Sequence, residues 1–60
     1  NDFSNDSYLL RMIALSHKEL QEFPQARNYY KKYIKSLEDM GASESLIKKA
    51  VEEESSLPAG

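Results

Sequence analysis

The sequence offers few residues that could carry out chemistry. It has one histidine, His17, and no cysteine, so it has no thiolate nucleophile, no cysteine metal site and no disulfide framework. Glu19 and Glu22 lie near His17, but this spacing does not place two carboxylates beside the imidazole on one helical face, as a metal site requires. We therefore expect no metal ion or other cofactor, and we interpret His17 as a residue at the edge of a packed core.

Two other sets of reactive side chains lack a catalytic arrangement. Ser16 directly precedes His17, and neighbours one residue apart on a helix point in different directions, so the two form no dyad. The carboxylates of Glu52, Glu53 and Glu54 diverge in the same way, and we interpret them as solvated. Because the chain also has no glycine-rich phosphate loop and no nucleophile elbow, we expect that it is not an enzyme.

Aromatic and basic residues are interleaved between Tyr29 and Tyr33, a composition that can stack on bases and follow phosphates. Helical spacing, however, places Tyr30 and Tyr33 on a buried face. Ten acidic and eight basic residues give a net charge of −2, so no overall basic field attracts nucleic acid. We expect neither a nucleic-acid partner nor a membrane span, because no apolar run approaches the roughly 18 residues that a span needs.

The composition predicts one small globular domain, or a fragment of one, over residues 1–60. Apolar residues make up 40% of the chain and charged residues 30%, with only two glycines and two prolines. The start at Asn1, without a methionine, indicates a piece of a longer protein, which we expect to be cytoplasmic. Burial of an apolar side chain contributes about 1.5–3 kcal/mol and ordering costs about 1.5 kcal/mol per residue. We therefore expect the unit to rely on neighbouring repeats, a second copy or a ligand.

The periodicity of the sequence predicts an all-α fold, with an antiparallel helical hairpin followed by a third, polar capping helix. We expect helices over about 5–21, 24–40 and 44–54, a flexible tail over 55–60, and no strand. Ser4 is the expected N-cap of the first helix, with Phe3 and Tyr8 as a hydrophobic staple. Gly41 is expected to end the second helix in a left-handed conformation, and Ser43 to cap the third.

The three helices differ in how many apolar sides they have. The second has one buried side, made of Ala26, Tyr29, Tyr30, Tyr33, Ile34, Leu37 and Met40. The first has a stripe expected to pack on the second, made of Leu9, Leu10, Ile13, His17 and Leu20. Beside it runs another apolar stripe, made of Tyr8, Met12 and Leu15. The third has a narrow stripe, typical of a capping helix, and we expect its acidic last turn to fray because negative charge there opposes the helix dipole.

This pattern resembles the tetratricopeptide repeat (TPR) between residues 7 and 40. The characteristic positions of that repeat are occupied here by Leu10, Ile13, Ala14, His17, Ala26 and Tyr30, and its aromatic-x-x-Ala turn by Phe23-Pro24-Gln25-Ala26. Ala14 and Ala26 would let the two helices approach closely. The sequence departs from the repeat at His17, Tyr33 and Glu38, where an aromatic residue, alanine and proline are usual.

The resemblance implies a protein–protein interaction module in which the first helix lines a groove for a peptide or a helix of a partner. The groove residues that it implies are Tyr8, Arg11, Met12, Leu15 and Lys18. Apolar side chains beside two cations favour an apolar partner segment with some acidic character. The alternatives are that the second stripe packs on a preceding repeat, or that it makes a homodimer and the chain is a self-association unit.

A second resemblance is to the microtubule-interacting-and-trafficking (MIT) type of three-helix bundle. It rests on the aromatic and basic run over 26–33, which follows an alanine-containing helix and a short turn. That family implies binding of short helical motifs in a groove between helices. The third helix expected here is short for such a bundle.

Overall fold

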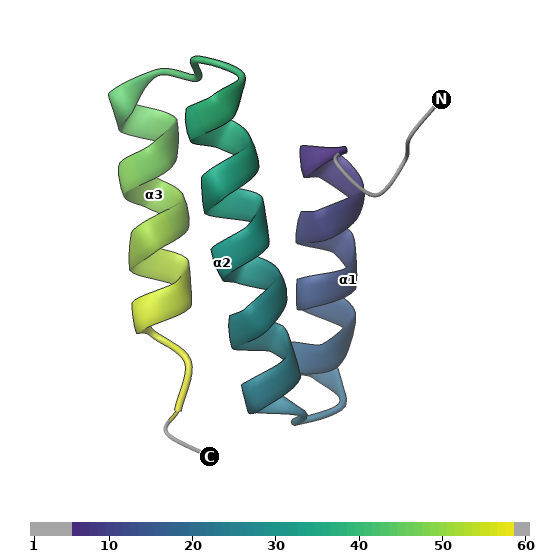
Figure 1. Ribbon diagram of the computed structural model, residues 1–60. Helices are drawn as coiled ribbons and strands as arrows, with labels where there is room; N and C mark the ends of the chain where they lie inside the picture. Colours follow the sequence, from purple (N-terminus) through teal and green to yellow (C-terminus); the bar gives the residue numbers. More distant parts are fainter. Residues whose placement is uncertain (1–5, 59–60) are drawn as a thin grey trace.

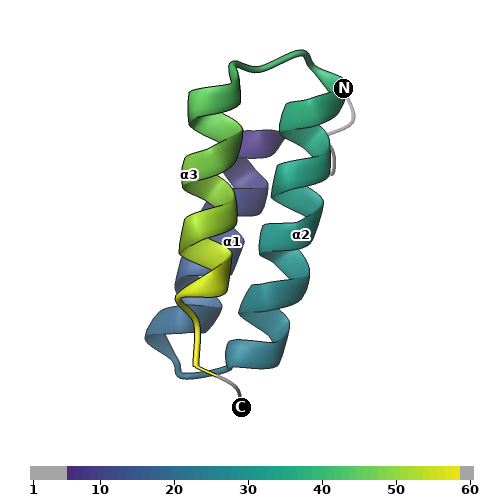
Figure 2. The same ribbon diagram turned by 90° about the vertical axis from the view of Figure 1, so that its left-hand side faces the viewer.

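The computed structural model describes residues 6–58, and they form three α-helices joined by tight turns. These are α1 (Ser7–Glu19), α2 (Phe23–Asp39) and α3 (Glu44–Ser55). α2 lies between the other two helices and packs on both (Figure 1). The three helices do not lie in one plane, because the view turned by 90° shows α2 displaced to one side of both α1 and α3 (Figure 2). α1 and α3 touch each other only marginally. The predicted all-α arrangement is confirmed, and no residue within 6–58 forms a strand.

The helix boundaries differ from the predicted ones mainly in α1, which is shorter at both ends. Asp6 is its N-cap, and the Asp6 side chain accepts a hydrogen bond from the Tyr8 backbone N–H at 2.9 Å. The staple residue Phe3 and the cap predicted at Ser4 lie outside the described residues. α2 and α3 differ from the predicted ranges by single residues.

α1 ends in a left-handed turn that the sequence analysis does not predict. Gln21 has a φ of 61°. Its N–H donates to the Lys18 carbonyl at 3.0 Å, and the Glu22 N–H donates to the His17 carbonyl at 2.8 Å. This is the Schellman pattern, whose left-handed position usually holds glycine because a Cβ atom destabilises that conformation by about 1 kcal/mol. The hydrogen bonds of the turn hold Gln21 in a conformation that is unfavourable for its residue type.

Replacing Gln21 by glycine is therefore expected to stabilise the protein by about 0.5–1 kcal/mol, after allowance for the greater freedom of glycine in the unfolded chain. The urea midpoint of the variant checks this result. Gln25→Gly is the matched control, because Gln25 lies within α2 and glycine there should destabilise. A loss of stability in both variants would contradict the left-handed conformation of Gln21.

The turn between α2 and α3 uses the same pattern with the predicted residues. Gly41 has a φ of 74°, its N–H donates to the Glu38 carbonyl at 3.2 Å, and the Ala42 N–H donates to the Leu37 carbonyl at 2.9 Å. The Ser43 hydroxyl accepts a hydrogen bond from the Leu46 N–H at 3.3 Å, which caps α3. The predicted roles of Gly41 and Ser43 are confirmed.

The core lies where α1 and α3 meet α2, and α2 supplies half of its buried residues. The buried residues are Leu10, Ala14, Ala26, Tyr30, Tyr33, Leu37, Ala50 and Leu57. Ala14 and Ala26 have no exposed surface, as expected of residues at a close contact between helices. Tyr30 is the largest side chain that is fully enclosed.

Residues 56–58, which follow α3, lie against the core, which differs from the flexible tail expected over 55–60; residues 59 and 60 of that tail lie outside the described residues. Leu57 is only 5% exposed. Arg27 of α2 donates to the Leu57 carbonyl at 3.2 Å and to the Pro58 carbonyl at 3.4 Å, and its other terminal nitrogen is 2.9 Å from a Glu54 carboxylate oxygen. Arg27 thus places a positive charge at the negative end of the α3 dipole. This compensates the acidic last turn that was expected to fray, and α3 continues to Ser55.

Candidate interaction surface

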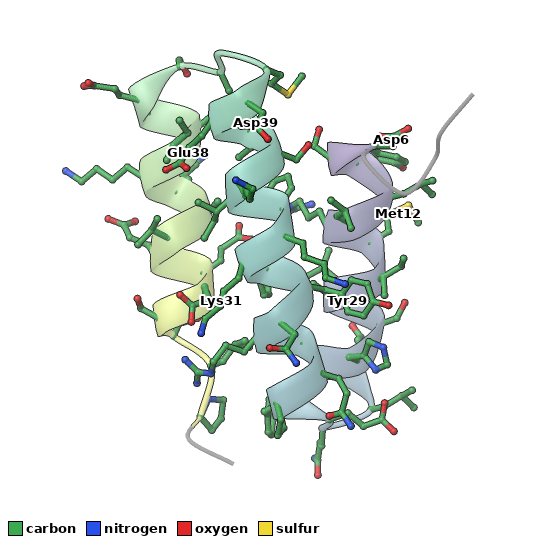
Figure 3. The ribbon with its side chains drawn as sticks, viewed as in Figure 1. Asp6, Met12, Tyr29, Lys31, Glu38 and Asp39 are labelled. Carbon is green, nitrogen blue, oxygen red and sulfur yellow. The ribbon has the colours of Figure 1, made fainter. Side chains whose placement is uncertain are left out.

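Large apolar side chains are exposed on the side of α1 that faces away from α2. Tyr8 is 68% exposed and Met12 46% exposed, and Leu20, just beyond the helix, is 69% exposed. Met12 projects outward from α1 (Figure 3). A surface hollow lies along the same side, lined by Met12, Leu15, Ser16, Glu19 and Leu20. This side of the molecule can therefore bury apolar surface against another molecule.

The hollow results from the order of large and small residues along α1. Tyr8, Met12, Ser16 and Leu20 are spaced four residues apart, so they form one ridge inclined to the helix axis; we call these four residues the outer ridge. Ser16 is the small member, and it lines the hollow together with its larger neighbours. Glu19 is the one charged residue in the lining.

The five site residues predicted from the sequence do not share one surface. Tyr8 and Met12 lie on the exposed outer side of α1, and Leu15 is half-buried, packing on the core while it lines the hollow. Lys18 is exposed and lines neither of the hollows described here. Arg11 faces α3 and lines a different hollow, between α1 and α3. The structure thus brings Met12 and Leu15 together and separates Arg11 from them.

The hollow between α1 and α3 contains a polar cluster contributed by all three helices. It is lined by Arg11, Tyr33, Leu46, Lys49, Ala50 and Glu53. The Arg11 guanidinium is 3.4 Å from one Glu53 carboxylate oxygen, while the other, Oε1, is buried and has no hydrogen-bond partner within residues 6–58. Burial raises the pKa of the Tyr30 hydroxyl above its ordinary value of 10.0, and the negative charge of Glu53 raises it further.

The interpretation of the three consecutive glutamates as solvated is wrong for two of them. Glu53 pairs with Arg11 of α1, and Glu54 pairs with Arg27 of α2. Glu52 is exposed. The sequence analysis missed these pairs because both arginines are more than 25 residues away along the chain, and only the packing of α1 and α3 on α2 brings them close.

His17 lies at the edge of the α1–α2 contact, as expected. Its Nδ1 is 2.6 Å from a Glu22 carboxylate oxygen, and its ring stacks on Tyr29 with centroids 5.6 Å apart and an interplanar angle of 15°. The Lys32 ammonium lies 5.1 Å from the centre of the Tyr29 ring. Tyr29 lies on the α1 side of α2 (Figure 3), so this cluster joins the two helices near their shared turn. Within residues 6–58, no three histidine, cysteine, aspartate or glutamate side chains are grouped as a metal site requires.

Sequence reasoning placed Leu20 on the buried stripe of the first helix, and that placement is wrong. The stripe was extended in helical phase to Leu20, but α1 ends at Glu19 and the left-handed Gln21 turns the chain away from α2. Leu20 is instead one of the most exposed apolar side chains, and Ile13 of the same predicted stripe is also exposed, at 36%. A glycine at position 21 would have marked the end of the helix and shown that Leu20 lies beyond it. Glutamine does not mark a left-handed turn in this way.

The chain matches no known family model, no curated protein and no solved structure. None of the three described helices is both long and apolar enough to cross a membrane.

Proposed function

We propose that this chain is a non-enzymatic protein–protein interaction module that binds a peptide or a helix of a partner protein through the outer side of α1. The observation that carries the proposal is the exposure of Tyr8, Met12 and Leu20 on the outer side of α1, where Met12 and Leu20 line one hollow. Exposed apolar residues that gather on one helix, rather than scattering singly, are typical of interaction sites. Burying them would also add apolar contacts to a unit whose own core has only eight buried residues.

A tetratricopeptide-like origin of the unit is part of this proposal. It is supported by the antiparallel α1–α2 hairpin, by the full burial of Ala14 and Ala26 at the helix contact, and by the polar outer side of α3. Arg11 and Lys18 are seven residues apart and so lie on the same side of α1. Lys18 is exposed, and we assign it the main role in attracting acidic residues of the partner segment; Arg11 contributes less, because it faces α3 and its charge is paired with Glu53.

The alternative MIT-type bundle receives less support. Its groove for helical motifs requires helices that pack closely as a three-helix bundle, whereas α1 and α3 touch only marginally here. The self-association alternative uses the same outer side of α1 and is considered below.

A synthetic 18-residue amphipathic helix with a leucine face and acidic flanks tests the proposal. Its binding to the chain is followed by fluorescence anisotropy of a dye attached to the peptide. The expected result is saturable binding that weakens at least tenfold in Met12→Glu, because the new carboxylate would be desolvated in the interface.

Val51→Glu is the matched control, because Val51 is an apolar residue of similar exposure, 42%, but lies on α3. It should bind the peptide as the parent chain does, and circular dichroism should show unchanged helix content in both variants. Equal weakening in the two variants, or no binding by the parent chain at a millimolar concentration, would overturn the proposed site.

A further inference from the structure

We propose that the outer ridge of α1 binds the outer ridge of a second copy of the chain, with the two α1 helices antiparallel. The proposal rests on the proposed function, because it uses the same surface, and it names the partner. It is carried by three features of the described residues: the gathering of exposed large apolar side chains on the outer side of α1, the order of large and small residues along the ridge, and the position of Glu19.

The outer sides of the other two helices are polar. α2 exposes Asn28, Lys32, Lys35 and Asp39, and α3 exposes Ser45, Lys48, Glu52 and Ser55. Three large apolar residues are exposed elsewhere: Met40 at the end of α2, and Leu46 and Val51 on α3. Five residues turn a helix by about 140°, so Leu46 and Val51 do not form one face. Head-to-tail association needs two different complementary surfaces, whereas a twofold pair needs one surface that fits itself. The outer side of α1 groups more of these side chains than either other helix, and this favours a closed pair of chains over an extended assembly.

The outer ridge is complementary to itself when one copy is reversed. A twofold axis passing midway between Met12 and Ser16 on the outer side places Tyr8 opposite Leu20 of the second copy and Met12 opposite its Ser16. Each Met12 then enters the hollow around Ser16 of the other copy, so a large side chain meets a small one at both equivalent positions. Packing of ridges spaced four residues apart is the commonest class of helix contact, with a crossing angle of about −50°.

The charge on this surface favours the antiparallel orientation. Glu19 is the only charged residue that lines the hollow, and it ends α1. In the antiparallel pair each Glu19 lies near the first turn of the other α1, which is the positive end of that helix dipole. Apart from the capping Asp6, that turn contains no acidic residue. In a parallel pair the two Glu19 carboxylates would face each other. The ridge consists of four residues of one helix, whereas a standard interface uses about 20–30 residues a side, so we expect a weak dimer.

Sedimentation equilibrium of the chain between about 10 μM and 1 mM tests the proposal. The average mass of the parent chain should rise with concentration from 6.9 kDa toward twice that value. Met12→Glu should raise the dissociation constant of the dimer at least tenfold, and Val51→Glu should leave it unchanged. A parent chain that keeps the monomer mass throughout, or a dimer that Met12→Glu leaves intact, would overturn the proposal.

A pair of charge variants tests the orientation directly. Ser16→Glu and Met12→Lys should each be at least tenfold weaker in self-association than the parent chain. An equimolar mixture should recover dimers, because the antiparallel pairing sets Glu against Lys at one contact and restores the parental Met12–Ser16 contact at the other. Failure of the mixture to recover dimers would overturn the antiparallel pairing, since both substituted positions are exposed and the folding of each variant is checked by circular dichroism.

The two proposals fail in different ways. A parent chain that stays monomeric but binds the synthetic amphipathic helix contradicts only the second copy as partner. A parent chain that neither dimerises nor binds that helix contradicts the proposed function as well.

Discussion

Leu57→Ala is expected to lower the free energy of unfolding by about 2–4 kcal/mol, which is a large fraction of the stability of so small a domain. Leu57 is 5% exposed and belongs to the core, although it lies beyond the last helix. Truncation to alanine removes its apolar contacts and leaves a cavity that the short segment after α3 can fill only in part. Urea denaturation followed by circular dichroism at 222 nm measures the change.

Leu20→Ala is the control for this prediction. It makes the same chemical change at a leucine that is 69% exposed, so the free energy of unfolding should change by less than about 0.5 kcal/mol. If Leu57→Ala were as mild as Leu20→Ala, the segment after Ser55 would not be packed on the core. The Arg27 hydrogen bonds to the Leu57 and Pro58 carbonyls would then have no role in holding it.

Ala26→Leu is expected to abolish cooperative unfolding of the three-helix unit, or to lower its stability by about 3 kcal/mol where it still folds. Ala26 has no exposed surface in the contact between α1 and α2, and a leucine there requires the two helices to move apart. Their separation would also disturb Tyr30, the largest enclosed side chain. Thermal unfolding followed by circular dichroism measures the effect.

Asn28→Leu is the matched control, because it adds a leucine to the exposed side of the same helix. Its thermal transition should stay within a few degrees of that of the parent chain. A cooperative transition at the parental temperature in Ala26→Leu would show that α1 and α2 are not in contact at this residue.

The parts of the fold that the sequence predicts correctly depend on interactions between near neighbours in the chain. Gly41 and Ser43 bound the turn between α2 and α3 because a left-handed position and an N-cap each select particular residue types within a few positions. The buried face of α2 follows from the 3.6-residue period, and Tyr30, Tyr33 and Leu37 are buried as predicted. The prediction is wrong for Met40, which lies just beyond the end of α2 and is 65% exposed. Such signals need no knowledge of what the helix packs against.

The errors concern features that depend on contacts between distant residues or on an unfavourable local conformation. Glu53 and Glu54 are paired rather than solvated, because the packing of the helices brings Arg11 and Arg27 to them. Leu57 looks like part of a polar tail in the sequence, yet it reaches the core once α3 is in place. Gln21 adopts a left-handed conformation that its residue type disfavours, and hydrogen bonds to two carbonyls of α1 offset that cost.

The candidate site shows the same division. The sequence by itself determined that α1 has more apolar surface than one partner helix can cover, since Tyr8, Met12 and Leu15 recur beside the stripe that contains Leu10. Only the tertiary structure decided which of these side chains are exposed, because that depends on the direction from which α2 and α3 approach α1. The packing of α2 and α3 on α1 leaves Leu15 half-buried and places Arg11 beside Glu53. Tyr8 and Met12 remain exposed on the outer side. A helical period specifies which residues share a face, but burial of that face depends on the position of its neighbours.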